Sequence, residues 1–264
     1  MSHSICDVPG FRVGHVDDPT ALTGCTVILP PGAAIAGVDV RGSAPGTREI
    51  ELLKPVRLVQ SVHAVLLTGG SAFGLDAAAG VQRFLAERGI GFKTDDAIIP
   101  IVPVAVIYDL GVGDASIRPN AEMGYRACQA ATRSLSRGNI GVGCGATVGK
   151  IMGMKRASRG GIGTCSEEIG QGVWVGVLTV VNCFGEVIDP GNGKILAGVR
   201  NDSGDGFIPT LVVMKTSGTN SPFIYSNTTL SVVATNALLS REETTKIAQM
   251  AQNGLARAIR PAHT

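Results

Sequence analysis

The side chain best placed to do chemistry by itself is Thr228, which stands where a polar turn becomes a β-branched run. Residues 226–235 read SNTTLSVVAT, and the second half of this segment is typical of a strand. If the bond between Asn227 and Thr228 were cut, Thr228 would carry both a hydroxyl and a free α-amine. An α-amine with a pKa of about 7.7–8.0 accepts a hydroxyl proton near neutral pH, so the two groups form a minimal nucleophile and base. Taken alone, the pattern is more typical of a turn that enters a core strand.

Three further polar residues end apolar or glycine-rich runs. Asn182 follows the apolar run 173–181, and a buried amide there is either a hydrogen-bonded structural group or a donor to an oxyanion. Tyr108 ends an apolar run whose prolines are typical of an edge or bulged strand, and its phenol either reaches a site or bonds to backbone in the core. Lys150 closes the glycine-rich segment 138–150, which we interpret as a tight strand and turn that presents this lysine.

A serine in a glycine turn is a weaker candidate. Residues 68–74 (TGGSAFG) follow a buried strand and precede a helical pattern, so their backbone N–H groups could hold an oxyanion or a carboxylate. A nucleophile elbow, G-x-S-x-G, would need glycine where Phe73 stands. We therefore expect Ser71 to cap the helix or to line a pocket.

A phosphate-binding loop and a cysteine nucleophile are also weak interpretations. In the pattern G-x-x-x-x-G-K-[ST], Cys144 replaces the first glycine and Ile151 replaces the hydroxyl residue. Cys144 itself would need a neighbouring base, and neither His15 nor His63 has a readable link to it.

The composition favours a cytoplasmic globular protein. The 264 residues are 44% hydrophobic and 17% charged, which allows a sizeable core, and the 36 glycines fall in short clusters that indicate tight turns. Basic and acidic residues are interspersed and give a net charge of +2, and only 4% of residues are aromatic, so we expect no nucleic-acid partner. No apolar run reaches about 18 residues and no signal peptide opens the chain, so we expect no membrane partner. The six cysteines lack Cys-x-x-Cys spacing and the four histidines are scattered, so we expect reduced thiols and no metal site.

The elements that would position these residues can be outlined from periodicity. Residues 173–182 and 228–235 are predicted strands, as is 211–214, whereas 189–207 is a predicted surface loop and 215–226 a linker. A helix is predicted over 120–135. Ser240 and Glu243 form a capping box for a second helix that ends before Pro261, and its moderate apolar stripe is expected to face the core.

The motifs together resemble the DmpA-like family of N-terminal-nucleophile hydrolases, and the resemblance covers nearly the whole chain. This family includes L-aminopeptidase/D-esterases, β-peptidyl aminopeptidases and endo-type hydrolases of nylon oligomers. The resemblance rests on four segments that occur in this order: residues 41–49 (RGSAPGTRE), 67–76 (LTGGSAFGLD), 145–150 (GATVGK) and 227–230 (NTTL).

The resemblance implies an α+β fold, a four-layer αββα sandwich shared with ornithine acetyltransferases, in one domain over residues 1–264. It implies self-cleavage between Asn227 and Thr228 into a large subunit, 1–227, and a small subunit that begins with 228–264. Thr228 matches the family's nucleophile and Asn182 its oxyanion donor, while Tyr108 and Lys150 look like its other pocket residues. The expected activity is hydrolysis of peptide or oligoamide bonds through an acyl-enzyme, without cofactor or metal, by a homo-oligomer of cleaved pairs.

The resemblance is incomplete at one end. Members of this family continue past the His-Thr that ends this sequence, into an acidic motif that orients the nucleophile, so we expect the C-terminus to be truncated. Two other hypotheses stay open, of which the second rests on this truncation. One is acyl transfer of the ornithine acetyltransferase type, and the other is a catalytically impaired oligomeric scaffold.

Overall fold

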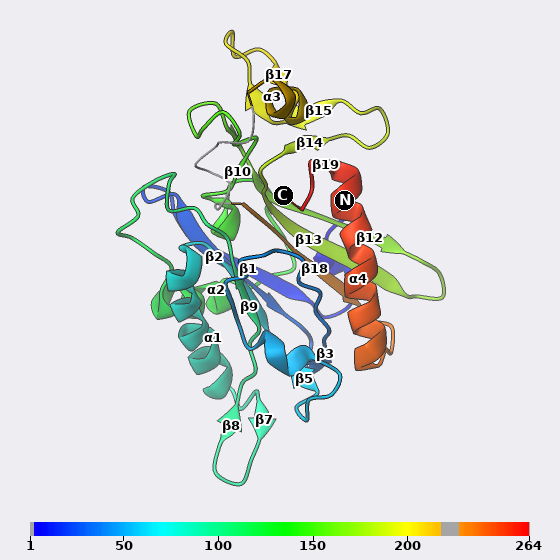
Figure 1. Cartoon of the computed structure of the whole chain (residues 1–264). Helices are drawn as coiled ribbons and strands as arrows, with labels where there is room; N and C mark the ends of the chain where they lie inside the picture. Colours follow the sequence, from blue (N-terminus) through cyan, green and yellow to red (C-terminus); the bar gives the residue numbers. More distant parts are fainter. Residues whose placement is uncertain (1–2, 218–226, 264) are drawn as a thin grey trace.

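Two β-sheets lie face to face between helices in the computed structural model, which describes residues 3–217 and 227–263 (Figure 1). The first sheet has the strand order β1-β2-β6-β9-β4, in which only the β6–β9 pair is parallel. Its strands are β1 (Arg12–Asp18), β2 (Thr23–Leu29), β4 (Thr47–Arg48), β6 (Val65–Thr68) and β9 (Val104–Val106). The second sheet is antiparallel and consists of β12 (Gly161–Glu168), β13 (Trp174–Asn182) and β18 (Thr228–Thr235).

The interior between the two sheets is apolar. One cluster of buried side chains joins Val13, Ile28 and Leu67 of the first sheet to Leu178 and Val180 of the second. Burial of this kind stabilises the fold by about 25 cal/mol per Å² of apolar surface removed from water. The cluster fixes which face of β13 and β18 points inward, and that face carries the candidate site at its end.

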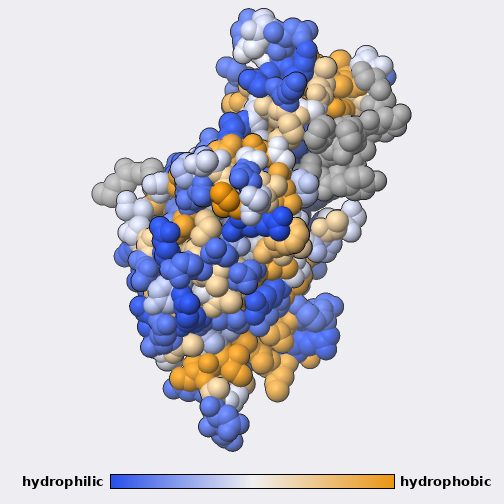
Figure 2. Space-filling model, turned by 90° about the vertical axis from the view of Figure 1, so that its left-hand side faces the viewer, coloured by the Kyte–Doolittle hydropathy of each residue, from blue (hydrophilic) through white to orange (hydrophobic). Residues whose placement is uncertain are grey.

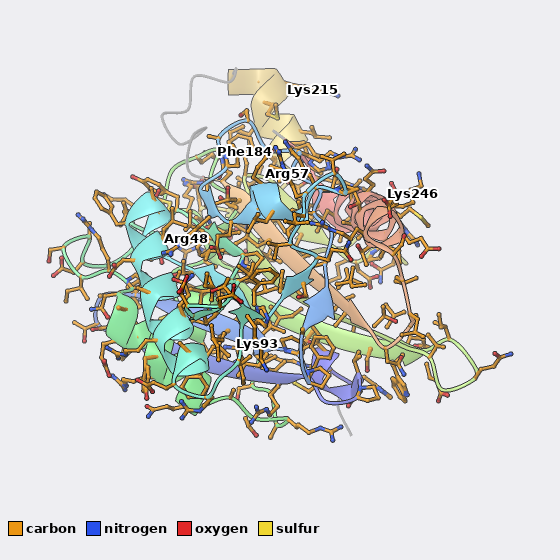
Figure 3. The ribbon with its side chains drawn as sticks, turned by 90° about the horizontal axis from the view of Figure 1, so that it is seen from below. Arg48, Arg57, Lys93, Phe184, Lys215 and Lys246 are labelled. Atoms are coloured by element: carbon orange, nitrogen blue, oxygen red, sulfur yellow. The ribbon has the colours of Figure 1, made fainter. Side chains whose placement is uncertain are left out.

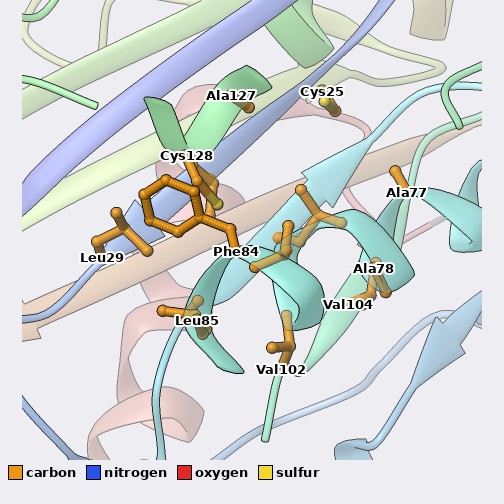
Figure 4. Close-up of a cluster of buried hydrophobic side chains, with 14 residues drawn as sticks. Cys25, Leu29, Ala77, Ala78, Phe84, Leu85, Val102, Val104, Ala127 and Cys128 are labelled. Carbon is orange, nitrogen blue, oxygen red and sulfur yellow. The ribbon is translucent and has the colours of Figure 1, made fainter. Parts of the chain in front are cut away.

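The outer face of the first sheet is covered by α1 (Ala77–Ala86) and α2 (Ala121–Gln129). Phe84 and Leu85 of α1 pack with Ala127 of α2 and Leu29 of β2 in a second core cluster (Figure 4). The helices approach closely because each has a glycine at the contact. A Cβ on Gly80 would lie 1.6 Å from the Ala121 carbonyl oxygen.

The outer side of the second sheet carries α4 (Arg241–Ala258), opposite α1 and α2, which completes the four layers (Figure 1). The predicted capping box is present: Ser240 Oγ accepts from the Glu243 N–H and Glu243 accepts from the Ser240 N–H. The predicted apolar stripe is buried only in part. Leu255 packs against a cluster that includes Val181 of β13, whereas Met250 is 58% exposed.

Shorter elements connect and flank these layers. They are η1 (Ile5–Asp7), β3 (Ala34–Ile35), η2 (Ile50–Leu53), β5 (Ser61–Val62), η3 (Ser71–Asp76), β7 (Phe92–Lys93), β8 (Ile98–Ile99), η4 (Gly141–Gly143), β10 (Thr147–Val148), β11 (Ser158–Arg159), β14 (Glu186–Ile188), β15 (Ile195–Ala197), β16 (Val199–Arg200), β17 (Phe207–Ile208), α3 (Thr210–Ser217) and β19 (Ile259–Arg260). The predicted surface loop 189–207 thus contains β15 and β16 and the start of β17.

The predicted strand 211–214 is wrong, because these residues belong to α3. The Pro209 carbonyl accepts from the Val212 N–H, and the buried Glu186 carboxylate accepts from the Thr210 N–H at 2.8 Å. Val213 packs on Phe184, which lies close to α3 in the view from below (Figure 3). Tertiary contacts therefore override the β propensity of two adjacent valines. Residues 218–226 of the predicted linker lie outside the described residues.

The helix predicted over 120–135 is shorter than expected. Asn120 caps α2 through a bond from the Met123 N–H to its side-chain oxygen, and the helix ends at Gln129. Thr132 then exchanges two backbone hydrogen bonds with Val13 of β1, so the chain leaves the helix to pair with the sheet edge.

Candidate active site

Asn182 is the centre of a buried polar cluster at the end of β13. It is fully buried, and its Oδ1 accepts from the Thr147 N–H at 3.0 Å and from Lys150 Nζ at 2.8 Å. Its Nδ2 donates to the Tyr108 carbonyl oxygen at 3.1 Å. An oxygen that accepts from two donors cannot be exchanged with the amide nitrogen, so the orientation of the side chain is fixed. The amide of Asn182 is thus held in one orientation, with its donor nitrogen directed away from Lys150 and Thr147.

Lys150 enters the same cluster from the turn after β10, and only 1% of its surface is exposed. Its Nζ also donates to the Asn182 backbone oxygen at 3.0 Å. Burial lowers the pKa of Lys150 to about 7, and the nearby Cys183 acts in the opposite direction with a smaller effect. Burial therefore favours the neutral amine near neutral pH, a state in which an amine can accept or return a proton.

This burial predicts a pH-dependent stability. The unfolded chain keeps Lys150 protonated up to a pKa of about 10.4, so between about pH 7 and pH 10 it binds one more proton than the folded chain does. Relative to Lys150→Met, the free energy of unfolding of the unmodified protein should rise by about 1.4 kcal/mol per pH unit across this window and stay level below it. Urea titrations at pH 6, 7, 8 and 9 measure the difference. Parallel curves for the two proteins would show that the lysine is not held neutral.

Thr228 begins β18 and lies directly opposite Asn182 in the antiparallel pair β13–β18. Residues opposite each other on one face of such a pair have Cβ atoms about 4.5–5.5 Å apart. The alternation along β18 puts Thr228 on the same face as Leu230 and Val232, which pack into the core between the sheets. The register therefore brings the Thr228 side chain beside the Asn182 amide, with Asn227 immediately before it on the chain.

Tyr108 contributes its backbone to this cluster, since its carbonyl holds the Asn182 amide and its side chain is 41% exposed. The next residue, Asp109, is buried and accepts from the Gly70 N–H and from Thr23 Oγ1, both at 2.7 Å. Burial raises the pKa of Asp109, and these two hydrogen bonds oppose that effect. The sequence predicted that N–H groups of the glycine turn could hold an oxyanion or a carboxylate. In the structure, one of them holds the carboxylate of Asp109 from the same chain.

The glycine turn offers little to an oxyanion. The N–H groups of Gly69 and Ser71 donate to the carbonyl oxygens of Gly24 and Ile107, and that of Gly70 donates to Asp109. Gly70, not Ser71, holds the N-cap position of η3, and no side chain caps it.

The cysteine alternative is disfavoured by the surroundings of Cys144. Burial raises the pKa of this thiol, and its Sγ lies 3.9 Å from the Asp18 carbonyl oxygen. The two histidines bond elsewhere: His15 pairs with Thr26, and His63 accepts from the Ile101 N–H. A buried protonated thiol without a base is a poor nucleophile.

A cavity of about 600 Å³ opens beside the polar cluster and reaches Thr147. Its walls come from the loop after Tyr108, from β11 and from the β16–β17 hairpin, with Met154 and Phe207 among the apolar residues and Arg159 and Arg200 among the charged ones. This volume lies within the usual range of ligand sites, about 300–1,000 Å³. A second depression, of about 510 Å³, lies between β1 and α2 and shares no lining residue with the first.

Thr147, Asp109 and the two arginines were not singled out from the sequence. Thr147 lies inside the segment GATVGK and Asp109 directly follows Tyr108. The sequence signal for these two residues is therefore that they lie next to or near a candidate site residue. Nothing in the local sequence marks Arg159 or Arg200, since their position follows from strand pairing. In the part of the chain that the structure describes, no group of three or more His, Cys, Asp or Glu side chains is arranged to hold a metal ion. No helix there is long and apolar enough to cross a bilayer.

Comparison with known proteins gives consistent matches over nearly the whole chain. The model of the family described as peptidase family S58 matches residues 3–264. An uncharacterized aminopeptidase of Mycobacterium bovis is 45% identical over 278 residues, which cover 99% of this chain and 78% of the relative. A 6-aminohexanoate-oligomer endohydrolase of Kocuria sp. is 30% identical over 261 residues, which cover 98% of this chain and 70% of the relative.

A solved structure shares the fold. The L-aminopeptidase D-Ala-esterase/amidase of Ochrobactrum anthropi, described as a variant of the Ntn-hydrolase fold, superposes with a TM-score of 0.65 at 20% identity. The match covers 99% of this chain and 71% of that one.

Proposed function

Since this chain belongs to peptidase family S58, we propose that it hydrolyses linear amide bonds with Thr228 as nucleophile, after cutting itself before that residue. The observation that carries the proposal is the register of β13 and β18, which sets a hydroxyl opposite a buried, fixed amide at the end of a strand. The name of the Mycobacterium bovis relative supports a peptide substrate, and that of the Kocuria relative supports a linear oligoamide.

In the first step, Thr228 Oγ1 attacks the carbonyl carbon of Asn227 and displaces the Thr228 nitrogen, so that the amide becomes an ester. Water then cleaves this ester and leaves Asn227 with a carboxylate and Thr228 with a free amine. The products are a large subunit, 1–227, and a small subunit that starts at Thr228. The new amine accepts the proton of its own hydroxyl in each later turnover.

In turnover, the Thr228 amine accepts the proton of the Thr228 hydroxyl, and Oγ1 attacks the substrate carbonyl. The leaving amine of the substrate takes this proton when the amide bond breaks. We assign Asn182 Nδ2 as the oxyanion donor, because its orientation is fixed by Thr147 and Lys150 on the opposite side of the amide. Lys150 positions Asn182 and, with a pKa of about 7, is able to relay a proton. Tyr108 positions the amide through its carbonyl, and Gly111 and Val112 of the loop that follows it line the cavity. Water hydrolyses the acyl-enzyme and completes the cycle.

We also propose that the cleaved pairs assemble into a homo-oligomer in the cytoplasm. Phe92, Ile98 and Ile99 of the β7–β8 hairpin are exposed, and they contribute to an apolar patch at the lower end of the molecule (Figure 2). Such a patch on a protein surface favours an interface. All six cysteines are free thiols and five are buried, which suits a reducing compartment. Light scattering of the purified protein measures the assembly.

The activity is tested by incubating the purified protein with short peptides and with 6-aminohexanoate oligomers in ¹⁸O-labelled water. Hydrolysis through an acyl-enzyme is expected to put one ¹⁸O atom into the newly formed carboxylate and to release a free amine, both seen by mass spectrometry. When an amine acceptor is added, more of the acyl group should still be transferred to water than to the amine. This result separates hydrolysis from acyl transfer. A protein with a free Thr228 amine that cleaves no amide in such a panel would refute the proposed function.

A further inference from the structure

We propose that the cavity beside Thr147 binds a carboxylate on the leaving-amine part of the substrate, through Arg159 and Arg200. The proposal rests on the function proposed above and adds the substrate class: short linear amides whose leaving portion ends in a free carboxylate. Three observations support it: the position of the cavity, the net positive charge of its lining, and the opposite charges at the two ends of an aminopeptidase substrate. The acyl end of such a substrate carries an ammonium group and the leaving end a carboxylate.

The cavity is joined to the candidate site by one short structural link. Arg159 lies opposite Thr147 in the β10–β11 pair, and the Thr147 N–H donates to Asn182 Oδ1. Arg200 lies opposite Phe207 in the β16–β17 pair, on another wall of the same cavity. Both arginines therefore line the same cavity as Thr147, whose backbone holds the amide that faces Thr228.

The cavity lining carries two guanidinium groups and one carboxylate, so its net charge is positive. Arg159 donates to the Cys144 carbonyl oxygen and Arg200 donates to the Lys155 carbonyl oxygen at 2.7 Å, and both acceptors are neutral. Neither guanidinium forms an ion pair with any carboxylate of residues 3–217 or 227–263. Both side chains are exposed, and each guanidinium has further N–H donors to offer.

The carboxylates nearby offset only part of this charge, because Asp205 adds one negative charge to the cavity lining and its hydrogen bonds to neutral groups do not remove it. Its Oδ1 accepts from Asn201 Nδ2 at 2.8 Å and from Ser203 Oγ at 2.5 Å. Asp202 on the same loop pairs with Arg156. An incoming carboxylate would therefore meet two guanidinium groups whose planar forks match its two oxygens.

The sign of this charge assigns the cavity to one side of the scissile bond. The acyl portion of an aminopeptidase substrate carries a free ammonium, which two arginines would repel. The leaving portion of a dipeptide or of a short oligoamide carries the carboxylate, which they would attract. The apolar side chains of Met154 and Phe207 offer contact to the hydrocarbon between the scissile amide and that carboxylate.

The test compares matched dipeptides that end in a carboxylate or in a carboxamide and share all other atoms. The unmodified, self-cleaved protein is expected to hydrolyse the acid with a kcat/KM about 10-fold higher than the carboxamide, as a charge-assisted bond at an exposed site allows. Arg200→Gln should bring this preference close to 1, because it lowers kcat/KM for the acid by about 10-fold more than for the carboxamide. Raising the salt from 0.05 M to 0.5 M should also shrink the preference, because the contact is at the surface.

Arg126→Gln is the matched control, since that arginine is exposed, lines the second depression and does not line this cavity. It should keep the preference of the unmodified protein. Equal kcat/KM values of the unmodified protein for acid and carboxamide would overturn the assignment. So would an Arg200→Gln variant whose kcat/KM falls by the same factor for both.

Failure of the proposed function is distinguishable from failure of this inference. If neither dipeptide is hydrolysed, calorimetry with the same acid and carboxamide still reports binding. Tighter binding of the acid that Arg200→Gln abolishes supports the carboxylate site, and equal or absent binding of the two refutes it.

Discussion

Thr228→Ala is expected to leave a single uncut chain without measurable amidase activity. Alanine has no hydroxyl to attack the Asn227 carbonyl, so neither the ester nor the free amine forms, and the nucleophile of turnover is also absent. Loss of the nucleophile should reduce kcat by at least about 10⁴-fold. Denaturing electrophoresis and mass spectrometry report the cleavage, and amine release from a peptide substrate reports the activity.

Variants of the same strand separate the chemistry from the packing. Thr228→Ser and Thr228→Cys keep a nucleophilic atom and should retain partial cleavage on long incubation. Ser231→Ala changes an exposed hydroxyl on the opposite face of β18, where it bonds to Thr179 at 2.9 Å, and should be cut and active like the unmodified protein. A Thr228→Ala protein that still separates into two fragments would place the nucleophile elsewhere.

Asn182→Ala is expected to reduce both activity and stability. It removes the assigned oxyanion donor, which typically costs about 100- to 1,000-fold in kcat. It also leaves the Thr147 N–H and the Tyr108 carbonyl without the amide that joins them, while Lys150 Nζ loses one acceptor and keeps the backbone oxygen of residue 182. Stranding buried polar groups costs about 1–3 kcal/mol for each one that finds no other partner, so the free energy of unfolding should fall by about 3 kcal/mol.

The two effects of Asn182→Ala are measured separately, by kcat on protein verified as folded and by urea titration. Asn139→Ala is the matched control, because Asn139 is exposed and makes a side-chain bond to the Gly160 carbonyl in the loop before η4. It should change stability by less than about 1 kcal/mol and leave kcat unaltered. If Asn182→Ala keeps the kcat of the unmodified protein, Asn182 is a structural group alone.

Much of the fold could be predicted from the sequence. The family resemblance, the α+β sandwich with its four layers and the amide-hydrolase class are all confirmed. The strands over 173–182 and 228–235 were visible because β-branched runs report local propensity, and the capping box of α4 was visible because it is encoded within four residues. Such signals are local, so a single sequence is enough to find them.

What could not be predicted depends on contacts between distant segments. The residues of α3 have a strand-like sequence, and they form a helix because Glu186 and Phe184 contact them from elsewhere in the chain. The burial of Lys150, which lowers its pKa, comes from contacts with Asn182 on another segment, and the pairing of Arg159 with Thr147 follows from strand register. Register depends on the facing strand and cannot be derived from one strand's own sequence.

The roles proposed for Thr228, Asn182, Tyr108 and Lys150 depend on the new amine that self-cleavage would create. N-terminal sequencing of the purified, active protein tests this most directly. We predict two sequences in equal amounts, one from the start of the chain and one that begins Thr-Thr-Leu-Ser from residue 228. A single N-terminus in fully active protein, or a second terminus at any other residue, would contradict it.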